Sequence, residues 1–305
     1  MIDVEKISNY LKKLQKQIIK NFEQIDGKTT FKEDSWNYEN GSGGGLTCVI
    51  ENGGIFEKGG VNFSHIKANK LPDAILKTKP ELEGYSFEAM GVSIVMHSHN
   101  PYVPTSHMNV RFFIAENQND KTKKPIWWFG GGYDLTPFYG FKEDCIFWHQ
   151  TIKNACDPFG LELYPKYKKQ CDEYFYLPHR GETRGIGGIF FDYLNNNFEQ
   201  NFAFLQAVGE SYQKAYLPIV EKRKDMPYSE KQKHFQLYRR GRYVEFNLVY
   251  DKGTHFGLQS NGRTESILMS LPPEVHFIYN FKPKEHSKEK ELTDYYLVAR
   301  NWLAV

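Results

Sequence analysis

The sequence predicts an α+β fold, because long blocks with helical spacing and long blocks with strand composition follow one another without regular β–α–β alternation. Three segments in the middle of the chain read as consecutive strands joined by short turns: 91–99, 107–115 and 125–129. Short connections favour antiparallel pairing. The length of 305 residues fits either two modest domains or one large unit.

The composition excludes several classes of protein. With 39 Lys+Arg against 37 Asp+Glu, the net charge of +2 excludes an acidic disordered chain and a generally basic nucleic-acid coat. No apolar run approaches the roughly 18 to 20 residues of a spanning helix, and charges interrupt the first 25 residues, so we expect neither a membrane span nor a secretory signal. An aromatic share of 16 % suits a soluble enzyme with a ring-lined pocket.

Cysteine usage indicates a reducing compartment. The 4 cysteines show no C-x-x-C spacing and lie inside strand or helix patterns, where cysteine behaves as a small hydrophobic residue: Cys48, Cys145, Cys156 and Cys171. We therefore expect reduced core cysteines in a cytoplasmic protein.

The elements are predicted in the following order. Apolar residues at steps of three and four predict an amphipathic helix over about residues 1–26. The glycine-rich run 40–45 predicts a flexible loop, and 46–50 predicts a strand. Further along, the patterns predict helices over 144–155, 164–174 and 197–215, and strands over 186–193, 243–250 and 275–279.

Polar side chains gather on one face of the predicted strands, since residues two apart share a face. His107, Asn109 and Arg111 share one face of their strand, and Met108, Val110, Phe112 and Ile114 share the other. The preceding strand places Ser93, Val95, His97 and His99 on one face, and the strand 243–250 places Tyr243, Glu245 and Asn247 together. We interpret these faces as a pocket floor; an ordinary solvent-exposed face is the alternative.

The pair His97 and His99 can reach one metal ion from a single strand, and His107, His149 and His179 supply further imidazoles. Hydrogen-bonded pocket histidines are the alternative. His149 lies one helical turn from Cys145, so helix packing is its other interpretation.

Glycines and arginines mark the other candidate positions. Gly130–Gly132 let the backbone turn or approach a ligand, and they precede Asp134, which is either presented there or serves as a turn residue. Arginines concentrate beside glycines at Arg180, Arg184, Arg239, Arg240, Arg242 and Arg263. Because guanidinium forks bind carboxylates, these arginines favour a flat ligand with several acids over nucleic acid.

Several long motifs are distinctive: Gly59–Ser64, Ser106–Phe112, Gly131–Pro137, His179–Phe191, Gly241–Leu248 and Gly257–Pro272. Together they resemble oxygen-dependent coproporphyrinogen III oxidase. The resemblance runs in one order from about residue 30 almost to the end.

The resemblance implies one domain over 1–305, with a large, flat, mainly antiparallel sheet flanked by helices on both sides. It also implies a cytoplasmic homodimer, with 243–278 as a dimerisation segment. The implied reaction is oxidative decarboxylation of the ring A and B propionates of coproporphyrinogen III to vinyl groups. Molecular oxygen is the acceptor, protoporphyrinogen IX, CO2 and H2O2 are the products, and no organic cofactor takes part.

Carried over by position, the resemblance makes His107 the proton donor and Asp134 the carboxylate that accepts pyrrole N–H bonds. The implied substrate-binding positions are Ser93, Asn109, Val110, Arg111, Asn261, Gly262 and Arg263. Asn261 departs from the commoner Gly-Gly-Arg. The implied ligands of a divalent metal ion are His97, His107, His149 and His179.

Two other functions stay open from the residues alone. An unrelated metal-dependent oxygenase would bind iron through the His97 and His99 pair, and removing that iron would abolish its activity. A tetrapyrrole carrier would need the arginines and aromatic residues, but it would consume no oxygen.

Overall fold

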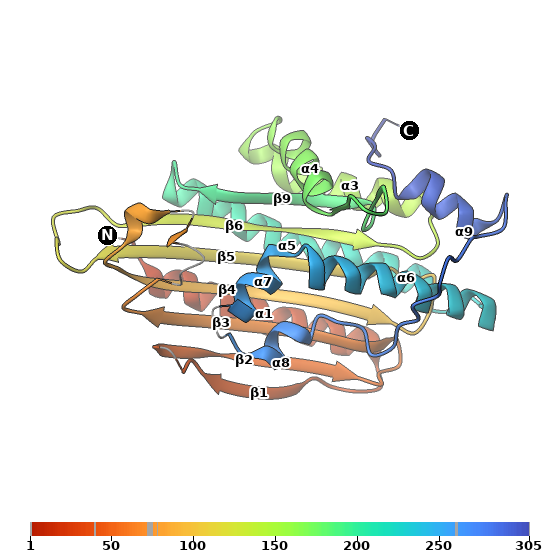
Figure 1. The fold of residues 1–305 in the computed structure, drawn as a ribbon, viewed down its shortest axis with the longest axis horizontal. Coiled ribbons are helices and arrows are strands. Elements are labelled where there is room, and N and C mark those ends of the chain that lie inside the picture. The colour runs from red at the N-terminus through yellow and green to blue at the C-terminus, as the bar shows by residue number, and fades with distance from the viewer. Residues whose placement is uncertain (1, 40, 72–75, 78, 260–261, 305) are drawn as a thin grey trace.

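A seven-stranded antiparallel sheet forms the middle layer of the protein (Figure 1). The computed structural model describes residues 2–39, 41–71, 76–77, 79–259 and 262–304. The strands, in spatial order, are β1 (Lys32–Asn37), β2 (Ser42–Glu51), β3 (Phe56–Ala68), β4 (Tyr85–Ser98), β5 (Thr105–Asn117), β6 (Ile126–Thr136) and β9 (Gly187–Leu194). A separate two-stranded ribbon pairs β7 (Tyr176–Leu177) with β8 (Glu182–Thr183).

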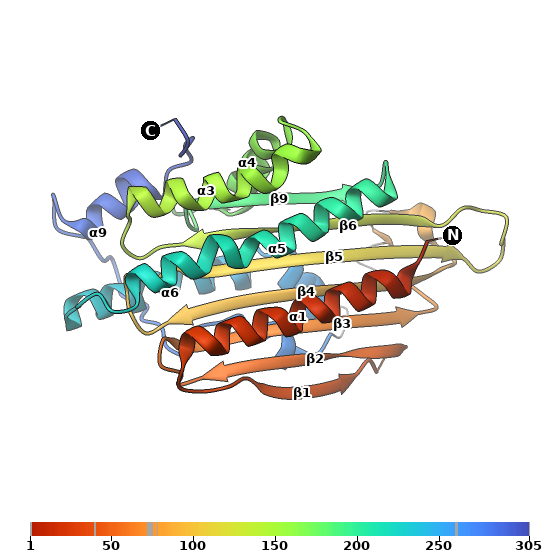
Figure 2. The same cartoon turned by 180° about the vertical axis from the view of Figure 1, so that it is seen from behind.

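Helices cover both faces of the sheet, which confirms the predicted α+β class. The helices are α1 (Val4–Asp26), α3 (Lys142–Cys156), α4 (Leu163–Tyr174), α5 (Phe198–Arg223), α6 (Glu230–Val249), α7 (Lys252–Gln259), α8 (Thr264–Leu268) and α9 (Lys288–Glu291). Shorter helical turns are η1 (Pro80–Leu82), η2 (Asp157–Phe159) and η3 (Leu292–Tyr296). Helices α6, α7 and α8 lie over one face (Figure 1), and α1 and α5 lie over the other (Figure 2).

The predicted amphipathic helix is α1, and it packs its apolar stripe on the sheet. Ile7, Ile18 and Phe22 are fully buried in the main core. At the end of the helix, Asp26 accepts hydrogen bonds from the backbone N–H groups of the β2–β3 hairpin, 2.9 Å from Ile55 and 3.0 Å from Phe56. These bonds fix the helix to the sheet, because a buried carboxylate needs such donors.

The predicted alternation of faces is confirmed in β5. Met108, Val110 and Phe112 point into the core shared with α1 and α5, and the side chains of His107 and Arg111 lie partly exposed on the opposite face. The face under α6–α8 is therefore the polar one. The predicted core cysteines are also confirmed, since all 4 are buried free thiols.

Two predictions about local structure are wrong. Gly43–Gly45 belong to β2 and are not a loop, because β3 pairs with all of them and β1 pairs with Gly44 and Gly45; Asn40 lies outside the described residues. Residues 275–279 form no strand. The triple glycine 130–132 lies inside β6 and makes no turn, so of the two roles predicted for these glycines only a close approach of the backbone stays open.

The segment 243–250 is helical, which corrects the strand predicted there. Its aromatic and β-branched residues have strand composition, but they continue α6, which starts at a capping box between Ser229 and Gln232. Tyr243 and Asn247, four residues apart, are both buried and share one face of the helix. Every helix within the described ranges is too short or too polar to cross a bilayer.

Candidate functional site

A buried carboxylate on β6 is the centre of the polar face. Asp134 is 2 % exposed, and Nη2 of Arg184 donates to both of its oxygens at 2.8 Å. The other guanidinium nitrogen, Nη1, donates to Oδ1 of Asn247 on α6 at 2.8 Å. The guanidinium also stacks on the ring of Phe175, 4.0 Å from its centroid. Aromatic packing and hydrogen bonds of this kind are what a buried ion pair needs to offset desolvation.

The backbone explains how residues 50 positions apart meet. Gly185 runs so close to β6 that a Cβ atom there would lie 2.1 Å from the Leu135 carbonyl oxygen. The next residue, Ile186, donates its N–H to that same oxygen at 2.9 Å. This tight approach at the start of β9 brings the side chain of Arg184 to Asp134.

His107 lies directly opposite Asp134 in the β5–β6 register, and its Nδ1 is 2.9 Å from Oδ1 of the carboxylate. Burial raises the pKa of Asp134, but the charge of Arg184 and the hydrogen bond from His107 outweigh it and lower the pKa below 3.8. An ionised carboxylate only accepts hydrogen bonds, so Nδ1 carries a hydrogen. Nε2 is then the ring nitrogen that can exchange a proton with a ligand.

A row of polar side chains crosses the same face of the sheet. From β5 to α8 it consists of Asn109, Ser93, Asn62, Thr47 and Ser266, the first four placed opposite one another by the strand registers. Thr47 donates to Asn62 at 2.8 Å, and its hydroxyl is 2.7 Å from that of Ser266. The row therefore links the predicted Asn109 and Ser93 to the segment that carries Arg263.

Arg111 stands at one end of this row. Its Nη1 donates to Asn109 at 2.9 Å, and its Nη2 is 2.9 Å from Oδ2 of Asp192 on β9. Gly130 on the intervening strand makes this reach possible, because a Cβ atom there would lie 3.0 Å from the guanidinium and 2.5 Å from Asp192. This close approach is the structural reason for the first glycine of the triple.

Arg263 stands at the other end, paired with Asp34 of β1 and donating to Ser266 at 3.2 Å. Gly262 precedes it and donates its N–H to the Gly257 carbonyl at 2.8 Å. Asn261 lies outside the described residues. The side chain of Val110 is fully buried on the opposite face, so only main-chain atoms of that residue can reach this site.

Two of the four predicted metal ligands are buried in hydrogen-bonded positions of their own. His97 bonds to Thr105 at 3.1 Å and to the Ser270 carbonyl at 2.9 Å. His149 bonds to the Ile186 carbonyl at 3.0 Å and to the Tyr164 hydroxyl at 3.1 Å. Burial lowers the pKa of both imidazoles to about 3, so both are neutral near pH 7. The hydrogen bonds just described occupy both nitrogens of each ring.

The other two predicted ligands, His107 and His179, lie elsewhere. His107 bonds to Asp134, and His179 bonds to Glu245 at 2.9 Å and to Tyr250 at 3.0 Å. Across the described ranges, no group of three or more His, Cys, Asp or Glu side chains is arranged to hold a metal ion. The four histidines therefore do not fit one shared metal site within a chain, and we assign no metal ligation to them.

The sequence indicates two residues of this site with a different role or element, and gives no sign of a third. Arg184 is expected to bind a ligand carboxylate but bonds to Asp134, and Asn247 is expected on a strand of the pocket floor but lies on α6. Asp251 follows α6, where its Oδ1 accepts from the Tyr174 hydroxyl at 2.7 Å. Burial raises the pKa of Asp251, but hydrogen bonds from Tyr174 and Thr254 lower it below its ordinary value. The contacts of Arg184, Asn247 and Asp251 join distant parts of the chain, so no local pattern predicts them.

The fold and the site define a class of protein. An imidazole held by a buried carboxylate can exchange protons, and partly exposed guanidinium groups at two places can bind carboxylates. These groups lie on one face of an antiparallel sheet, and the combination is typical of an enzyme that transfers protons to or from a polyanionic ligand.

The comparison with protein families gives the particular family. The family model described as coproporphyrinogen III oxidase matches residues 6–302. The chain belongs to the coproporphyrinogen III oxidase family, which confirms the resemblance seen in its motifs. Family membership makes it an enzyme of haem biosynthesis and implies coproporphyrinogen III as its substrate.

Proposed function

We propose that this chain is the oxygen-dependent form of the enzyme and converts coproporphyrinogen III to protoporphyrinogen IX. In each of two steps, a propionate carboxylate, O2 and one proton give a vinyl group, CO2 and H2O2. The C–C bond to the carboxylate breaks, a neighbouring C–H bond breaks, and the two electrons released reduce O2. The observation that carries the proposal is the bonding of His107 to the buried Asp134–Arg184 pair.

His107 is the proton donor in this proposal. Each step consumes one proton, and Nε2 of His107 is the ring atom left to deliver it. The side chain is 25 % exposed, so it has access to a ligand while Asp134 holds its orientation. A fixed tautomer and a fixed ring direction both favour proton delivery at one point.

Asp134 acts through its partners in this arrangement. Its oxygens already accept hydrogen bonds from Arg184 and His107, and a pyrrole N–H would have to displace one of them or use the remaining lone pair of Oδ2. The expected direct bond to the pyrrole nitrogens is therefore secondary here. The ionised carboxylate instead stabilises positive charge on His107 and on a reacting pyrrole nearby.

Arg111 and Arg263 bind propionates in this proposal. Their side chains are 35 % and 27 % exposed, and each is paired with an aspartate, Asp192 or Asp34. Exposed ion pairs of this kind contribute only about 0.2 to 1 kcal/mol, so a substrate carboxylate can replace the aspartate at little cost. The polar row between the two arginines then lies under the macrocycle.

We also propose a homodimer formed through 243–278. This segment exposes large apolar side chains at Leu248, Val249, Phe256, Leu258, Phe277 and Ile278. Exposed apolar side chains of this kind are typical of an interface between subunits.

One experiment tests the reaction. The sequence contains neither a dinucleotide-binding motif nor a cysteine cluster, which supports turnover without nicotinamide, flavin or S-adenosylmethionine. We expect no product when the protein and reduced substrate are incubated anaerobically, and the vinyl porphyrin after oxygen is admitted, as measured by chromatography of the oxidised porphyrins. Equal turnover without oxygen would refute the proposal.

A further inference from the structure

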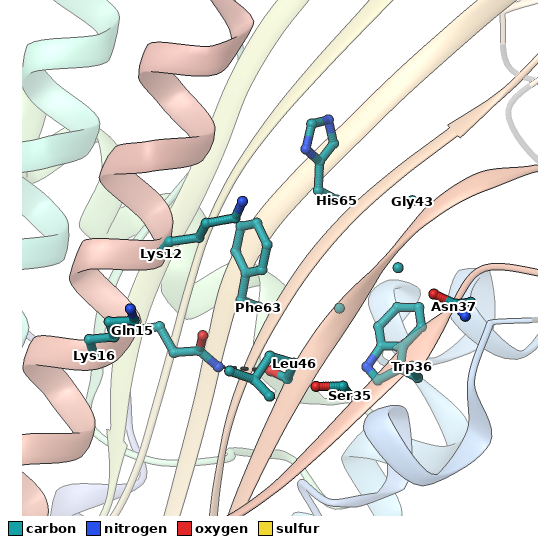
Figure 3. Close-up of a pocket in the computed structure, with 12 residues that line it drawn as sticks. Lys12, Gln15, Lys16, Ser35, Trp36, Asn37, Gly43, Leu46, Phe63 and His65 are labelled. Atoms are coloured by element: carbon teal, nitrogen blue, oxygen red, sulfur yellow. Dashed lines mark hydrogen bonds between the residues drawn. The ribbon is translucent and has the colours of Figure 1, made fainter.

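A cavity of about 530 Å³ that is wide open to solvent lies on the α1 side of the sheet, opposite the face of His107, and Figure 3 shows the residues that line it. It opens between the exposed edge of α1 and the strands β1, β2 and β3. Leu46 and Phe63 line it, and both pack against the core on the α1 side. Its size falls in the range of pockets that hold small organic ligands, about 300 to 1,000 Å³.

Glycines of β2 line the cavity. Gly44 shares a face with Leu46, and a Cβ atom there would lie 2.0 Å from the Trp36 carbonyl oxygen of β1, so only glycine lets β1 run this close. Gly45 faces the other side of the sheet, where the Trp36 indole covers it and donates to Thr47 of the polar row at 3.0 Å.

The charged side chains that line the cavity are basic. Its lining contains Lys12, Lys16 and His65, and none of the twelve lining residues is Asp or Glu. The two lysines are exposed one turn apart on α1, and neither forms an ion pair with a described residue. His65 differs, because its Nε2 is 2.9 Å from a carboxylate oxygen of Glu88. Two unpaired ammonium groups therefore border the cavity.

An apolar surface lies directly beside these charges. The ammonium of Lys12 is 5.6 Å from the centroid of the Phe63 ring. On the other side, Ser35 and Asn37 supply polar side chains that line the cavity. A ring-shaped body can contact Phe63 and Leu46 while an acidic group attached to it reaches the lysines.

We propose that this cavity is a second binding site, which takes a small organic anion with an aromatic or other cyclic apolar body. Lys12 and Lys16 bind the anionic group, and Phe63 and Leu46 contact the ring. The site is independent of the proposed oxygen chemistry, because it lies on the other face of the sheet and uses none of the residues there.

The test uses 8-anilinonaphthalene-1-sulfonate, an aromatic monoanion whose fluorescence rises in apolar sites. We expect the double variant K12M/K16M to bind it about 5- to 30-fold more weakly than the parent, since two exposed ionic contacts of about 0.5 to 1 kcal/mol each are lost. The matched control K13M/K20M removes the same charge from exposed positions of α1 that do not line the cavity, and it should keep parental affinity.

Two further measurements locate the probe. The uncharged N-phenyl-1-naphthylamine should bind the parent and K12M/K16M equally, because it lacks the anionic group. Hydrogen exchange should slow in α1 and β2 when the sulfonate binds. Parental affinity in K12M/K16M, an equal loss in K13M/K20M, or protection confined to 243–278 would each overturn the proposal.

Discussion

Removing the charge of Arg184 separates the stability of the site from its chemistry. Arg184→Met leaves Asp134 ionised and buried without its ion-pair partner, since the carboxylate is 2 % exposed. Breaking one half of a buried pair costs about 3 to 5 kcal/mol of unfolding free energy. Asp134→Asn alone should cost a similar amount, because it strands the guanidinium, which is also 2 % exposed.

The double variant D134N/R184M should lose less stability than the two single losses added together. It removes both charges together, and neutral groups in place of a buried pair are often tolerated. Its loss of unfolding free energy should therefore fall below the sum of the two single losses by a coupling of about 2 to 3 kcal/mol, within the range of contacting residues. Its turnover should nevertheless stay about 10²- to 10⁴-fold below the parent, because His107 loses its orienting carboxylate.

Urea unfolding measures the loss of stability and steady-state kinetics measures the loss of turnover, both on the parent, R184M, D134N and D134N/R184M. Acid adds a check, because the pKa of Asp134 is lower in the folded state than the ordinary 3.8. The stability that this group contributes is present above pH 3.8 and is lost as the pH falls from there through the folded pKa. The difference in unfolding free energy between the parent and R184M should therefore decrease as the pH falls below 3.8. Additive losses, or a double variant with parental turnover, would refute the reasoning.

Three further predictions concern the rest of the molecule. Arg111→Met and Arg263→Met should each weaken substrate binding about 10- to 160-fold, because a hydrogen bond to a charged group contributes about 1.5 to 3 kcal/mol. The Lys variants at the same positions should be impaired less. Michaelis constants measure the loss of binding, and parental Michaelis constants in both Met variants would contradict the assignment. His149→Phe should lower the unfolding free energy by about 1 to 3 kcal/mol, because it leaves the buried Tyr164 hydroxyl without this partner, whereas Trp302 still donates to the Ile186 carbonyl at 3.2 Å; a chelator should leave the stability of the parent unchanged, and a loss as large as that of the variant would reassign His149 as a ligand. Phe277→Glu should give a monomer in sedimentation at micromolar concentration, and an unchanged dimer would move the interface elsewhere.

Much of the sheet could be predicted because its periodicity is local. His107, Asn109 and Arg111 fall on one face of β5 as the two-residue repeat requires, and Met108, Val110, Phe112 and Ile114 are buried on the other. The helices α1, α3, α4 and α5 were also predicted from their spacing, with boundaries that moved by up to eight residues. Local patterns were sufficient there because burial follows the same period as the backbone.

The errors arose where composition and environment disagree. Tyr243, Phe246 and Tyr250 have strand composition, yet in α6 two of their rings pack around the guanidinium of Arg184. The pairing of Asp134 with Arg184 could not be predicted, since nothing local relates residues on β6 to the chain before β9. The faces of the site were accessible from the sequence, but its central ion pair depends on a register between distant strands.

The order of the strands has a consequence for the way the chain acquires its activity. From β1 to β6 every strand pairs with the next one in sequence, so most of the sheet forms by local hairpins. β9 alone joins after a long excursion through α3 and α4, and it closes the edge of β6, which carries Trp127, Trp128 and Phe129. Until β9 docks, Arg184 is not held at Asp134 and that aromatic strand is open to pairing with another chain. The pairing of β9 with β6 therefore both covers this aromatic edge of the sheet and brings Arg184 to Asp134.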